Sequence, residues 1–309
     1  MKLQLDFTPD ISPKKITTGN KITLLGSCFS DEMAGQFEKS GFKVESNHFG
    51  TIFHPIALAN LFLIEDVNLS IIQRDDLFLS WMAAGSVYGL NKESFFKSLV
   101  DLRNELKDSI KKSSFLFVTF GTAYGYEHKE FNTVVANCHK FPSCEFDKIL
   151  SSIGEMEQSW EMALEKIYEI NPEIQVVFTV SPVRHSKDGL VENNRSKARL
   201  IEVTNRLTIS EKEWYFPSYE LVVDVLRDYR FYKEDLVHPT QQAIDFVYYS
   251  VEHVFMDSDT REITRQVRKL RELTSHKLLY PESIKSSEFE LNTKNKIAKF
   301  LAEYPLVNW

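Results

Sequence analysis

Hydrophobic residues along the chain form two kinds of pattern, one typical of buried strands and one typical of amphipathic helices. Short continuous apolar runs predict strands that are buried on both faces. Apolar positions about 3.6 residues apart follow several of these runs and predict helices. The predicted strands cover residues 21–25, 42–46, 114–126 and 174–182, with a last full or partial strand at 214–224. The predicted helices cover residues 30–40, 152–171, 193–207 and 238–255.

Residues 51–114 interrupt this alternation and resemble an insertion between strands of the sheet. Two helical patterns lie in this segment, at about 55–64 and 93–112, and the string LFLSWMAAGSVYG (77–89) is consistent with a hairpin. We therefore expect an α/β domain over residues 1–257 with a helical and hairpin insertion at about 51–114. Residues 258–309 combine high charge with helical spacing, so we expect a C-terminal helical extension there.

Strands that alternate with helices indicate a mostly parallel sheet with helices on both faces. In such sheets the ligand crevice lies beyond the carboxyl ends of the strands. Four polar loops follow predicted strands, with the sequences GSCFS, NHFGTIFHP, GTAYGY and SPVRHSKDG. We expect these loops to gather on one side of the sheet and to form the functional site.

Composition and charge narrow the class of protein. Of the 309 residues, 43% are hydrophobic, and the formal net charge of −7 disfavours nucleic acid and anionic membranes as partners. No apolar run reaches the roughly 18 residues that a membrane helix needs, and the first residues do not resemble a signal peptide. Three cysteines do not suggest a disulfide framework. We expect a soluble cytoplasmic protein with no nucleic-acid or membrane partner, and the oligomeric state stays open.

Cys28 follows the first predicted strand, at the point where a helix begins. Helix N-termini lower the pKa of a thiol and make it nucleophilic, although a free cysteine can also be a small buried apolar residue. Asp235 and His238 lie three residues apart before another predicted helix and can form a pair that activates a nucleophile. Such a pair alone is more often a capping or surface feature, and its combination with Cys28 favours catalysis.

The strings GSCFS (26–30) and DLVHPT (235–240) resemble motifs of the GSCFA family, which is related to the SGNH/GDSL hydrolases. Further strings that resemble this family are FGTIFHP, TFGTAYGY, NCHKFP, TVSPVRHSKDG, NNRSKARL and YFPSYELVVDVLRDYRFYKEDLVHPT. The resemblance covers roughly residues 20–250. It implies a flavodoxin-like sheet and the hydrolysis or transfer of small acyl esters, often acetyl groups on carbohydrates.

The catalytic plan of the SGNH relatives implies a role for four residues of this chain. Their first block has a serine nucleophile in third position, where this chain has Cys28, and an aspartate where this chain has Ser27. Their Asp-x-x-His motif is intact as Asp235 and His238. Cys28 is therefore the expected nucleophile, His238 its base and Asp235 the residue that orients the base. Ser27 is the alternative nucleophile, and we expect it to turn away from His238 and to hydrogen-bond neighbouring backbone.

The expected oxyanion hole departs from the pattern of these relatives. Their glycine donor matches Gly50, and their third block has an asparagine where this chain has Ala123. The resemblance implies that the backbone N–H groups of Cys28 and Gly50 stabilise the oxyanion. Asn137 or the hydroxyl of Thr122 can replace the donor that is missing at Ala123.

Arg184 and His185 follow a predicted strand end and are candidates for binding an anionic or hydroxyl-rich part of a substrate. Arg184 can equally pair with an internal carboxylate. A zinc site could be formed by Cys138, His139 and Cys144, since cysteine and histidine are common zinc ligands. Their spacing, however, matches no common structural zinc site. We therefore expect neither a metal nor an organic cofactor.

Two functions remain open from the sequence. The leading hypothesis is a hydrolase or acyltransferase that acts on a small-molecule or carbohydrate ester through Cys28 or Ser27, with His238 and Asp235. The alternative is a non-catalytic carbohydrate-binding or scaffold module that keeps the fold. The altered third block favours the alternative, whereas the Asp-x-x-His motif and the thiol at a strand end favour catalysis.

Overall fold

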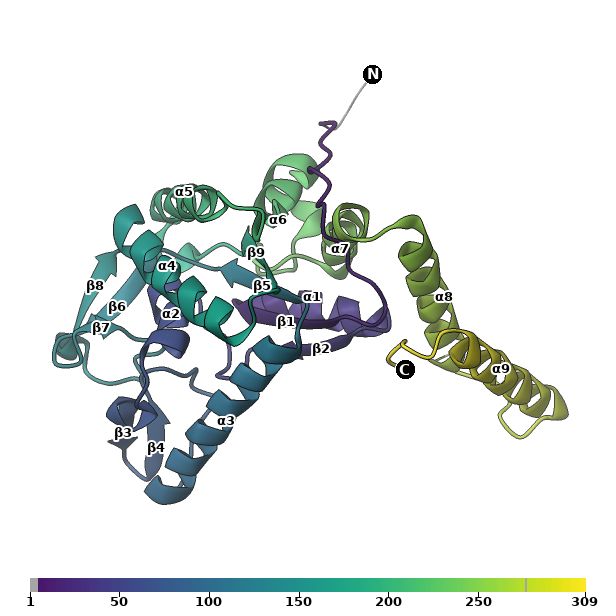
Figure 1. The fold of residues 1–309 in the computed structure, drawn as a ribbon, viewed down its shortest axis with the longest axis horizontal. Helices are drawn as coiled ribbons and strands as arrows, with labels where there is room; N and C mark the ends of the chain where they lie inside the picture. Colours follow the sequence, from purple (N-terminus) through teal and green to yellow (C-terminus); the bar gives the residue numbers. More distant parts are fainter. Residues whose placement is uncertain (1–4, 276) are drawn as a thin grey trace.

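A five-stranded parallel sheet forms the centre of the protein (Figure 1). The computed structural model describes residues 5–275 and 277–309. The strands of the sheet are β1 (Lys21–Gly26), β2 (Lys43–Ser46), β5 (Phe115–Phe120), β9 (Gln175–Val180) and β10 (Glu213–Tyr215). All neighbours are parallel in the order β10-β9-β5-β1-β2, which is the 2-1-3-4-5 order of flavodoxin-like sheets. The predicted fold class is confirmed.

Helices cover both faces of this sheet. The helices from α1 to α7 belong to this α/β body, namely α1 (Cys28–Lys39), α2 (Pro55–Leu63), α3 (Lys92–Lys112), α4 (Ile153–Ile170), α5 (Leu190–Leu207), α6 (Ser218–Glu220) and α7 (Gln241–Phe255). Two more helices follow, α8 (Ser258–Ser275) and α9 (Ile284–Glu303). Successive strand residues point to opposite faces, so Leu24 packs with α1 and α7 whereas Leu25 packs with α2, α3, α4 and α5. This alternation gives the protein two cores, one on each face of the sheet.

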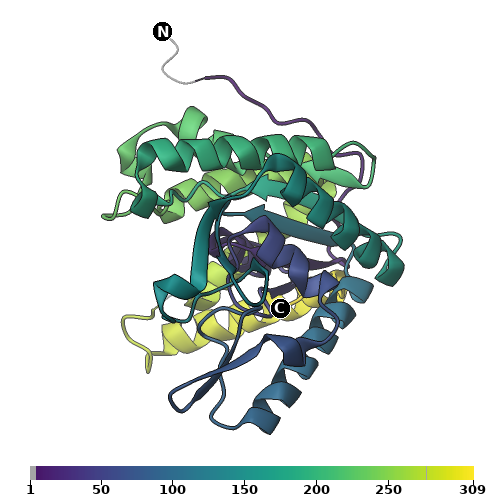
Figure 2. The same cartoon turned by 90° about the vertical axis from the view of Figure 1, so that its left-hand side faces the viewer.

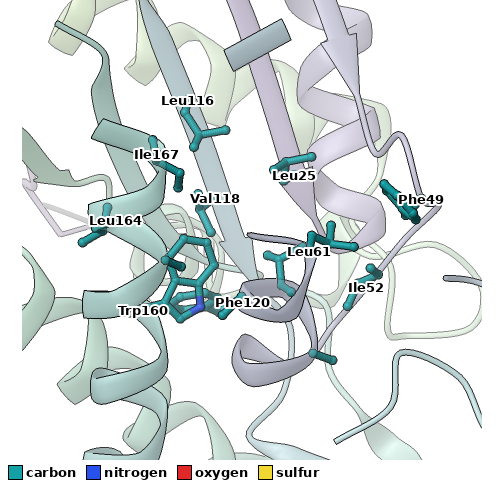
Figure 3. Packing of buried hydrophobic residues seen from close by; sticks show 14 of the residues in the cluster. Leu25, Phe49, Ile52, Leu61, Leu116, Val118, Phe120, Trp160, Leu164 and Ile167 are labelled. Atoms are coloured by element: carbon teal, nitrogen blue, oxygen red, sulfur yellow. The ribbon is translucent and has the colours of Figure 1, made fainter. Parts of the chain in front are cut away.

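The larger core lies between the sheet and the helices α2, α3, α4 and α5, and Figure 3 shows part of it around α2 and α4. Trp160 of α4 is fully buried there, and its ring centroid lies 5.3 Å from those of both Phe120 and Phe178. Its indole N–H donates to the carbonyl oxygen of Pro55 at 3.0 Å, which satisfies its polar atom and ties α4 to the first turn of α2. The start of α2 is therefore fixed next to the loop that follows β2.

The apolar segment 114–126 does not form one strand. β5 ends at Phe120, and residues after it enter a separate antiparallel sheet of β6 (Tyr124–His128), β7 (Thr133–Val134) and β8 (Phe146–Leu150). The chain turns between the two sheets because the N–H groups of Gly121 and Thr122 both donate to the carbonyl oxygen of Phe53. The second sheet was not predicted, because its strands are short and the start of β6 lies within the apolar segment 114–126.

The segment 51–114 contains both predicted helices and a hairpin that begins earlier than predicted. β3 (Ile71–Arg74) and β4 (Leu77–Ser80) form this antiparallel hairpin, whereas the string 77–89 closes on itself only through a bridge between Phe78 and Gly89. The hairpin lies beside the N-terminal part of α3, at one end of the molecule (Figures 1 and 2). After the hairpin, α3 packs against the larger core and leads the chain back to β5.

Helices α8 and α9 lie side by side and project from the α/β body (Figure 1). Arg268 of α8 donates to the hydroxyl of Ser40 and to the carboxylate of Glu252, so it joins α8 to the end of α1 and to α7. The chain end returns to the same place, where the N–H of Asn308 donates to the carbonyl oxygen of Gly41 at 2.8 Å. In the described residues, every helix is too short or too polar to cross a bilayer.

Candidate functional site

The polar loops that follow the sheet strands contact one another at the carboxyl ends of the strands. The N–H of Ile52, after β2, donates to the carbonyl oxygen of Gly26 at the end of β1, at 2.9 Å. The N–H of Gly121, after β5, donates to the carbonyl oxygen of Phe53 at 2.8 Å. The Phe53 ring in turn contacts the ring of His185, after β9, with 5.4 Å between the centroids. The prediction that the four loops gather on one side is confirmed.

Cys28 is the first residue of α1, directly after the turn that ends β1. This turn requires a glycine, because Gly26 has a φ of 124° and its N–H donates to Oδ1 of Asn47 at 2.8 Å. Ser27 is the buried N-cap of α1, and its Oγ accepts a hydrogen bond from the N–H of Phe29 at 3.3 Å. The expected backbone hydrogen bond of Ser27 is therefore confirmed, and the side chain of Cys28 is half-buried.

The surroundings of the Cys28 thiol raise its pKa. Burial is the largest cause, and the carboxylates of Asp31 and Glu32 on the same helix act in the same direction. The backbone N–H groups of Cys28 and Phe29 act in the opposite direction and lower the pKa, without overcoming burial. The sequence-based prediction of a lowered thiol pKa is therefore wrong, because desolvation of the thiolate outweighs the helix N-terminus.

Asp235 and His238 form the expected pair in the loop before α7. Oδ2 of Asp235 lies 2.7 Å from Nδ1 of His238, and Oδ1 accepts hydrogen bonds of 2.9 Å from the N–H groups of Val237 and His238. These donors lower the pKa of Asp235 to about 2, with the backbone N–H of His238 the largest cause. Both side chains are about half exposed, so Nε2 of His238 is accessible to a substrate.

His185 lies close enough to His238 for their charges to interact. Burial, followed by the positive charge of Lys197, lowers the pKa of His185 to about 4, and the charge of His238 adds to this effect. His185 is therefore neutral at pH 7. Within residues 5–275 and 277–309, no hydrogen bond joins the Cys28 sulfur to the His238 imidazole. The prediction that Cys28 faces His238 stays a prediction.

Two of the expected oxyanion donors already have partners inside the protein. The N–H of Gly50 donates to the carbonyl oxygen of Asn47 at 2.7 Å. The hydroxyl of Thr122 lies 3.1 Å from that of Ser196, and its oxygen accepts a hydrogen bond of 3.0 Å from the N–H of Tyr124. The N–H of Gly50 would have to leave its partner before it could bind an oxyanion.

The side-chain amide of Asn137 has one polar atom with a partner and one without. Its Oδ1 accepts a hydrogen bond of 2.7 Å from the N–H of His139, while its Nδ2 has no hydrogen-bond partner in the described part of the chain. This Nδ2 lies 3.6 Å from the position that a Cβ would take at Gly85. The residue before Gly85, Ala84, donates its N–H to the carbonyl oxygen of Phe49 at 2.9 Å. Asn137 therefore lies close to the loop that contains Gly50.

A cavity of about 580 Å³ opens beside this edge of the sheet. Residues from the polar loops form one wall, among them Phe53, Thr122, Asn137 and His185. Aromatic residues from the second sheet and the loops around it form much of the rest, namely Tyr124, Tyr126, Phe141 and Phe146. A cavity of this size is typical of small-molecule sites and holds a group much larger than an acetyl.

Arg184 lies outside the lining of this cavity and stacks on tyrosines. Its guanidinium lies 4.8 Å from the ring centroid of Tyr232 and 5.8 Å from that of Tyr229. In the described residues Arg184 forms no ion pair with a carboxylate, so the alternative of an internal ion pair is not realised. Because Tyr232 precedes Asp235 by three residues, Arg184 supports the loop that carries the Asp235–His238 pair.

The three residues that suggested zinc have other surroundings. Cys138 is half-buried and Cys144 is exposed, and both are free thiols. Nε2 of His139 lies 2.8 Å from the carbonyl oxygen of Ser80. The part of the chain that the structure describes has no group of three or more His, Cys, Asp or Glu side chains arranged to hold a metal ion.

Sequence reasoning missed Lys197, which is buried at the carboxyl ends of β5 and β9. Its side chain is 1% exposed, and its Nζ donates to the carbonyl oxygens of Gly121 at 2.6 Å and Ser181 at 2.7 Å. Those two residues directly follow β5 and β9. The available signal was a lysine on the apolar stripe of the predicted helix 193–207, three residues before the buried Leu200.

Comparisons with known proteins give one family and several distant structures. The sequence pattern of the GSCFA family matches residues 21–250, and no curated protein matches the chain. A carbohydrate esterase family 3 from Talaromyces cellulolyticus is 8% identical, with 81% of this chain and 99% of that chain covered and a TM-score of 0.39. A Clostridium thermocellum family 3 carbohydrate esterase is also 8% identical, with 81% and 98% covered and a TM-score of 0.35. The periplasmic domain of a Salmonella ser. Paratyphi A lipopolysaccharide acetyltransferase is 10% identical, with 75% and 82% covered and a TM-score of 0.35.

Proposed function

Because the chain belongs to the GSCFA family, we propose that it hydrolyses or transfers a small acyl ester of acetyl type, carried by a carbohydrate or another small molecule. The observation that carries this proposal is the 2.7 Å contact between Asp235 and His238 at the edge of the sheet where Cys28 begins α1. An imidazole held at Nδ1 by a carboxylate keeps Nε2 free to take a proton from a nucleophile.

The proposed reaction proceeds through a thioester. His238 accepts the proton of the Cys28 thiol, and the sulfur attacks the ester carbonyl. The backbone N–H of Cys28 and the Nδ2 of Asn137 stabilise the oxyanion, because the N–H of Gly50 is already bonded to Asn47. His238 returns the proton to the leaving alcohol. A water molecule or a sugar hydroxyl then attacks the thioester and releases the acid or the new ester.

Turnover of p-nitrophenyl acetate by point variants tests this proposal. We expect His238→Ala and Cys28→Ala to lose turnover, because each removes a group that reacts. Asp235→Asn should lose less, since other contacts still hold the ring, and Ser27→Ala should keep most activity. In wild-type protein quenched during turnover, mass spectrometry should find the acetyl group on the peptide that contains Cys28.

Two results would contradict specific parts of the mechanism. Full activity in a folded His238→Ala variant would remove the triad. An active Cys28→Ala variant together with an inactive Ser27→Ala variant would make Ser27 the nucleophile, with the sequence register shifted by one residue.

A non-catalytic binding or scaffold module is the second candidate, and the raised pKa of the Cys28 thiol favours it. Iodoacetamide separates the two functions in the wild-type protein. Rapid, pH-dependent alkylation of Cys28 in the folded protein supports catalysis. Alkylation of Cys28 only after unfolding supports the binding module, since a thiol that reacts with no small electrophile is a poor nucleophile.

A further inference from the structure

Lys197 is a buried basic group with no carboxylate partner among the described residues. In the described residues its Nζ contacts two carbonyl oxygens, those of Gly121 and Ser181, and forms no ion pair. Carbonyl oxygens satisfy two of the three ammonium donors but do not neutralise the charge. A buried charge that is not neutralised destabilises a protein. A lysine at such a position is therefore a candidate for a functional role.

Three titratable groups from three other parts of the chain face Lys197. The N–H of Ser27 donates to the carbonyl oxygen of Thr119 at 3.1 Å, and Lys197 donates to Gly121, two residues further along the same strand end. Cys28 therefore begins α1 at the strand end that Lys197 contacts, and its thiolate raises the pKa of Lys197. His185 after β9 has its own pKa lowered by the Lys197 charge. The ring of Tyr219 in α6 lies 5.9 Å from Nζ. His185 cannot become an anion at ordinary pH, and burial raises the pKa of Tyr219. Cys28 is therefore the group that most readily forms an anion beside Lys197.

We propose that Lys197 is a positioning residue whose buried ammonium stabilises the thiolate of Cys28 when His238 removes the thiol proton. This inference rests on the proposed role of Cys28 as the nucleophile. Lys197 also holds the backbone at the ends of β5 and β9, so the charge is fixed relative to the loops that form the site. A fixed charge stabilises a developing anion without the cost of reorientation.

The electrostatics of the two groups are complementary. Burial is the largest cause of the lowered pKa of Lys197, which is about 7 even with the opposing effect of Cys28, and also the largest cause of the raised pKa of Cys28. Burial therefore disfavours the charged form of each group. When both are charged, the attraction offsets part of both desolvation costs. Asp31 and Glu32 on α1 disfavour the thiolate. In the proposed pairing, Lys197 supplies the opposing charge from α5.

The rate of iodoacetamide alkylation of Cys28, measured against pH by peptide mass spectrometry, tests this pairing in the full chain. Lys197→Gln removes the charge but keeps two N–H donors for the carbonyl oxygens. Lys197→Met removes the charge and the donors. We expect both variants to move the midpoint of the Cys28 profile upward by about one pH unit or more. Alkylation at neutral pH should then fall about tenfold. Lys197→Arg, which keeps the charge, should restore part of the wild-type rate.

Lys187→Gln is a matched control, because it removes a lysine charge that acts on Cys138. We expect it to leave the Cys28 profile unchanged. A Lys197→Gln variant that is folded by circular dichroism and keeps the wild-type Cys28 profile would overturn the inference. A shift with Lys197→Met but not with Lys197→Gln would also overturn it, since Lys197 would then serve only to hold the backbone.

The outcomes separate this inference from the proposed function. Ester turnover that depends on Cys28 and His238, with an alkylation profile indifferent to Lys197, supports the proposed function and refutes the pairing. An alkylation profile that depends on Lys197 in a protein with no esterase activity supports the pairing and refutes the proposed function.

Discussion

At the scale of single residues, the turn between Asp235 and His238 holds an unusual backbone conformation. Leu236 has a φ of 58°, in the left-handed region that residues with large side chains rarely adopt. The carboxylate of Asp235 compensates by accepting hydrogen bonds from the N–H groups of Val237 and His238. The same carboxylate binds Nδ1 of His238, so one side chain fixes both the turn and the orientation of the ring.

Asn137 is the residue on which the oxyanion proposal can be tested most sharply. Asn137→Ala should lower kcat about a hundredfold with little change in KM, because an oxyanion donor acts mainly in the transition state. Asn137→Asp keeps the oxygen that accepts from the N–H of His139 but loses the Nδ2 donor, so it should lose as much. Steady-state kinetics with p-nitrophenyl acetate measure both. If Asn137→Asp is fully active and Asn137→Ala is merely less stable, Asn137 only orders its loop.

At the scale of elements, the connection from β1 to α1 determines where the thiol lies. β1 ends in a turn at Gly26, and α1 begins two residues later, with Ser27 as its cap. A side chain at Gly26 would overlap the carbonyl oxygen of Thr119 in the neighbouring strand β5. The close approach of β5 therefore excludes any other residue at this turn, and the turn places Cys28 beyond the strand end.

Two glycine substitutions within this unit should have opposite effects. Gly26→Ala should destabilise the protein by about 3 kcal/mol or more, because of the overlap with Thr119 and the positive φ. Gly35→Ala in α1 should be neutral or stabilise by up to about 1 kcal/mol, since no atom lies within 4 Å of its new Cβ and alanine favours helices. Urea unfolding measures both free energies. A tolerated Gly26→Ala would show that β1 and β5 can separate at this end.

At the scale of the whole molecule, buried histidines should make stability depend on pH. His54 is buried, its Nδ1 accepts from the N–H of Ile56, and burial lowers its pKa from 6.5 to about 4. Between these values the unfolded chain binds a proton that the folded protein does not, so stability rises with pH. The contribution of His54 is complete above about pH 6.5 and is lost progressively as the pH falls towards 4.

We expect the free energy of unfolding to fall by roughly 3 kcal/mol from His54 alone between pH 6.5 and 4, measured by urea denaturation at a series of pH values. His54→Asn should flatten this dependence, because asparagine can still cap α2 but does not titrate. Part of the slope should remain in this variant, since the pKa of His185 is lowered to about 4 as well. An identical slope in both proteins would contradict the assignment to His54.

The division of the chain at residue 257 stays a prediction at this scale. α8 begins at Ser258, as the change in composition suggested. However, Arg268 contacts Ser40 and Glu252, and the backbone of Asn308 contacts Gly41, so the last two helices are joined to the α/β body. Whether residues 1–257 fold alone depends on how much of the stability these contacts supply.

The sequence by itself determined the features that depend on neighbouring residues. Apolar periodicity located the strands of the parallel sheet and the helices that cover it, because burial on one face or two leaves a repeating pattern. The cap of α1 at Ser27 and the contact between Asp235 and His238 were predictable as well, since each joins residues at most three positions apart. The short strands of the second sheet and the first strand of the β3–β4 hairpin escaped this reasoning.

Only the tertiary structure decided the chemical state of the candidate site. The raised pKa of Cys28, the engaged N–H of Gly50 and the buried ammonium of Lys197 all depend on burial and on partners from other segments of the chain. Desolvation and Coulomb interactions follow distance in space, and the spacing of residues along a sequence does not encode that distance. Lys197 in the middle of α5 reaches the ends of β5 and β9 because α5 packs against the sheet, and the end of β1 lies next to that of β5.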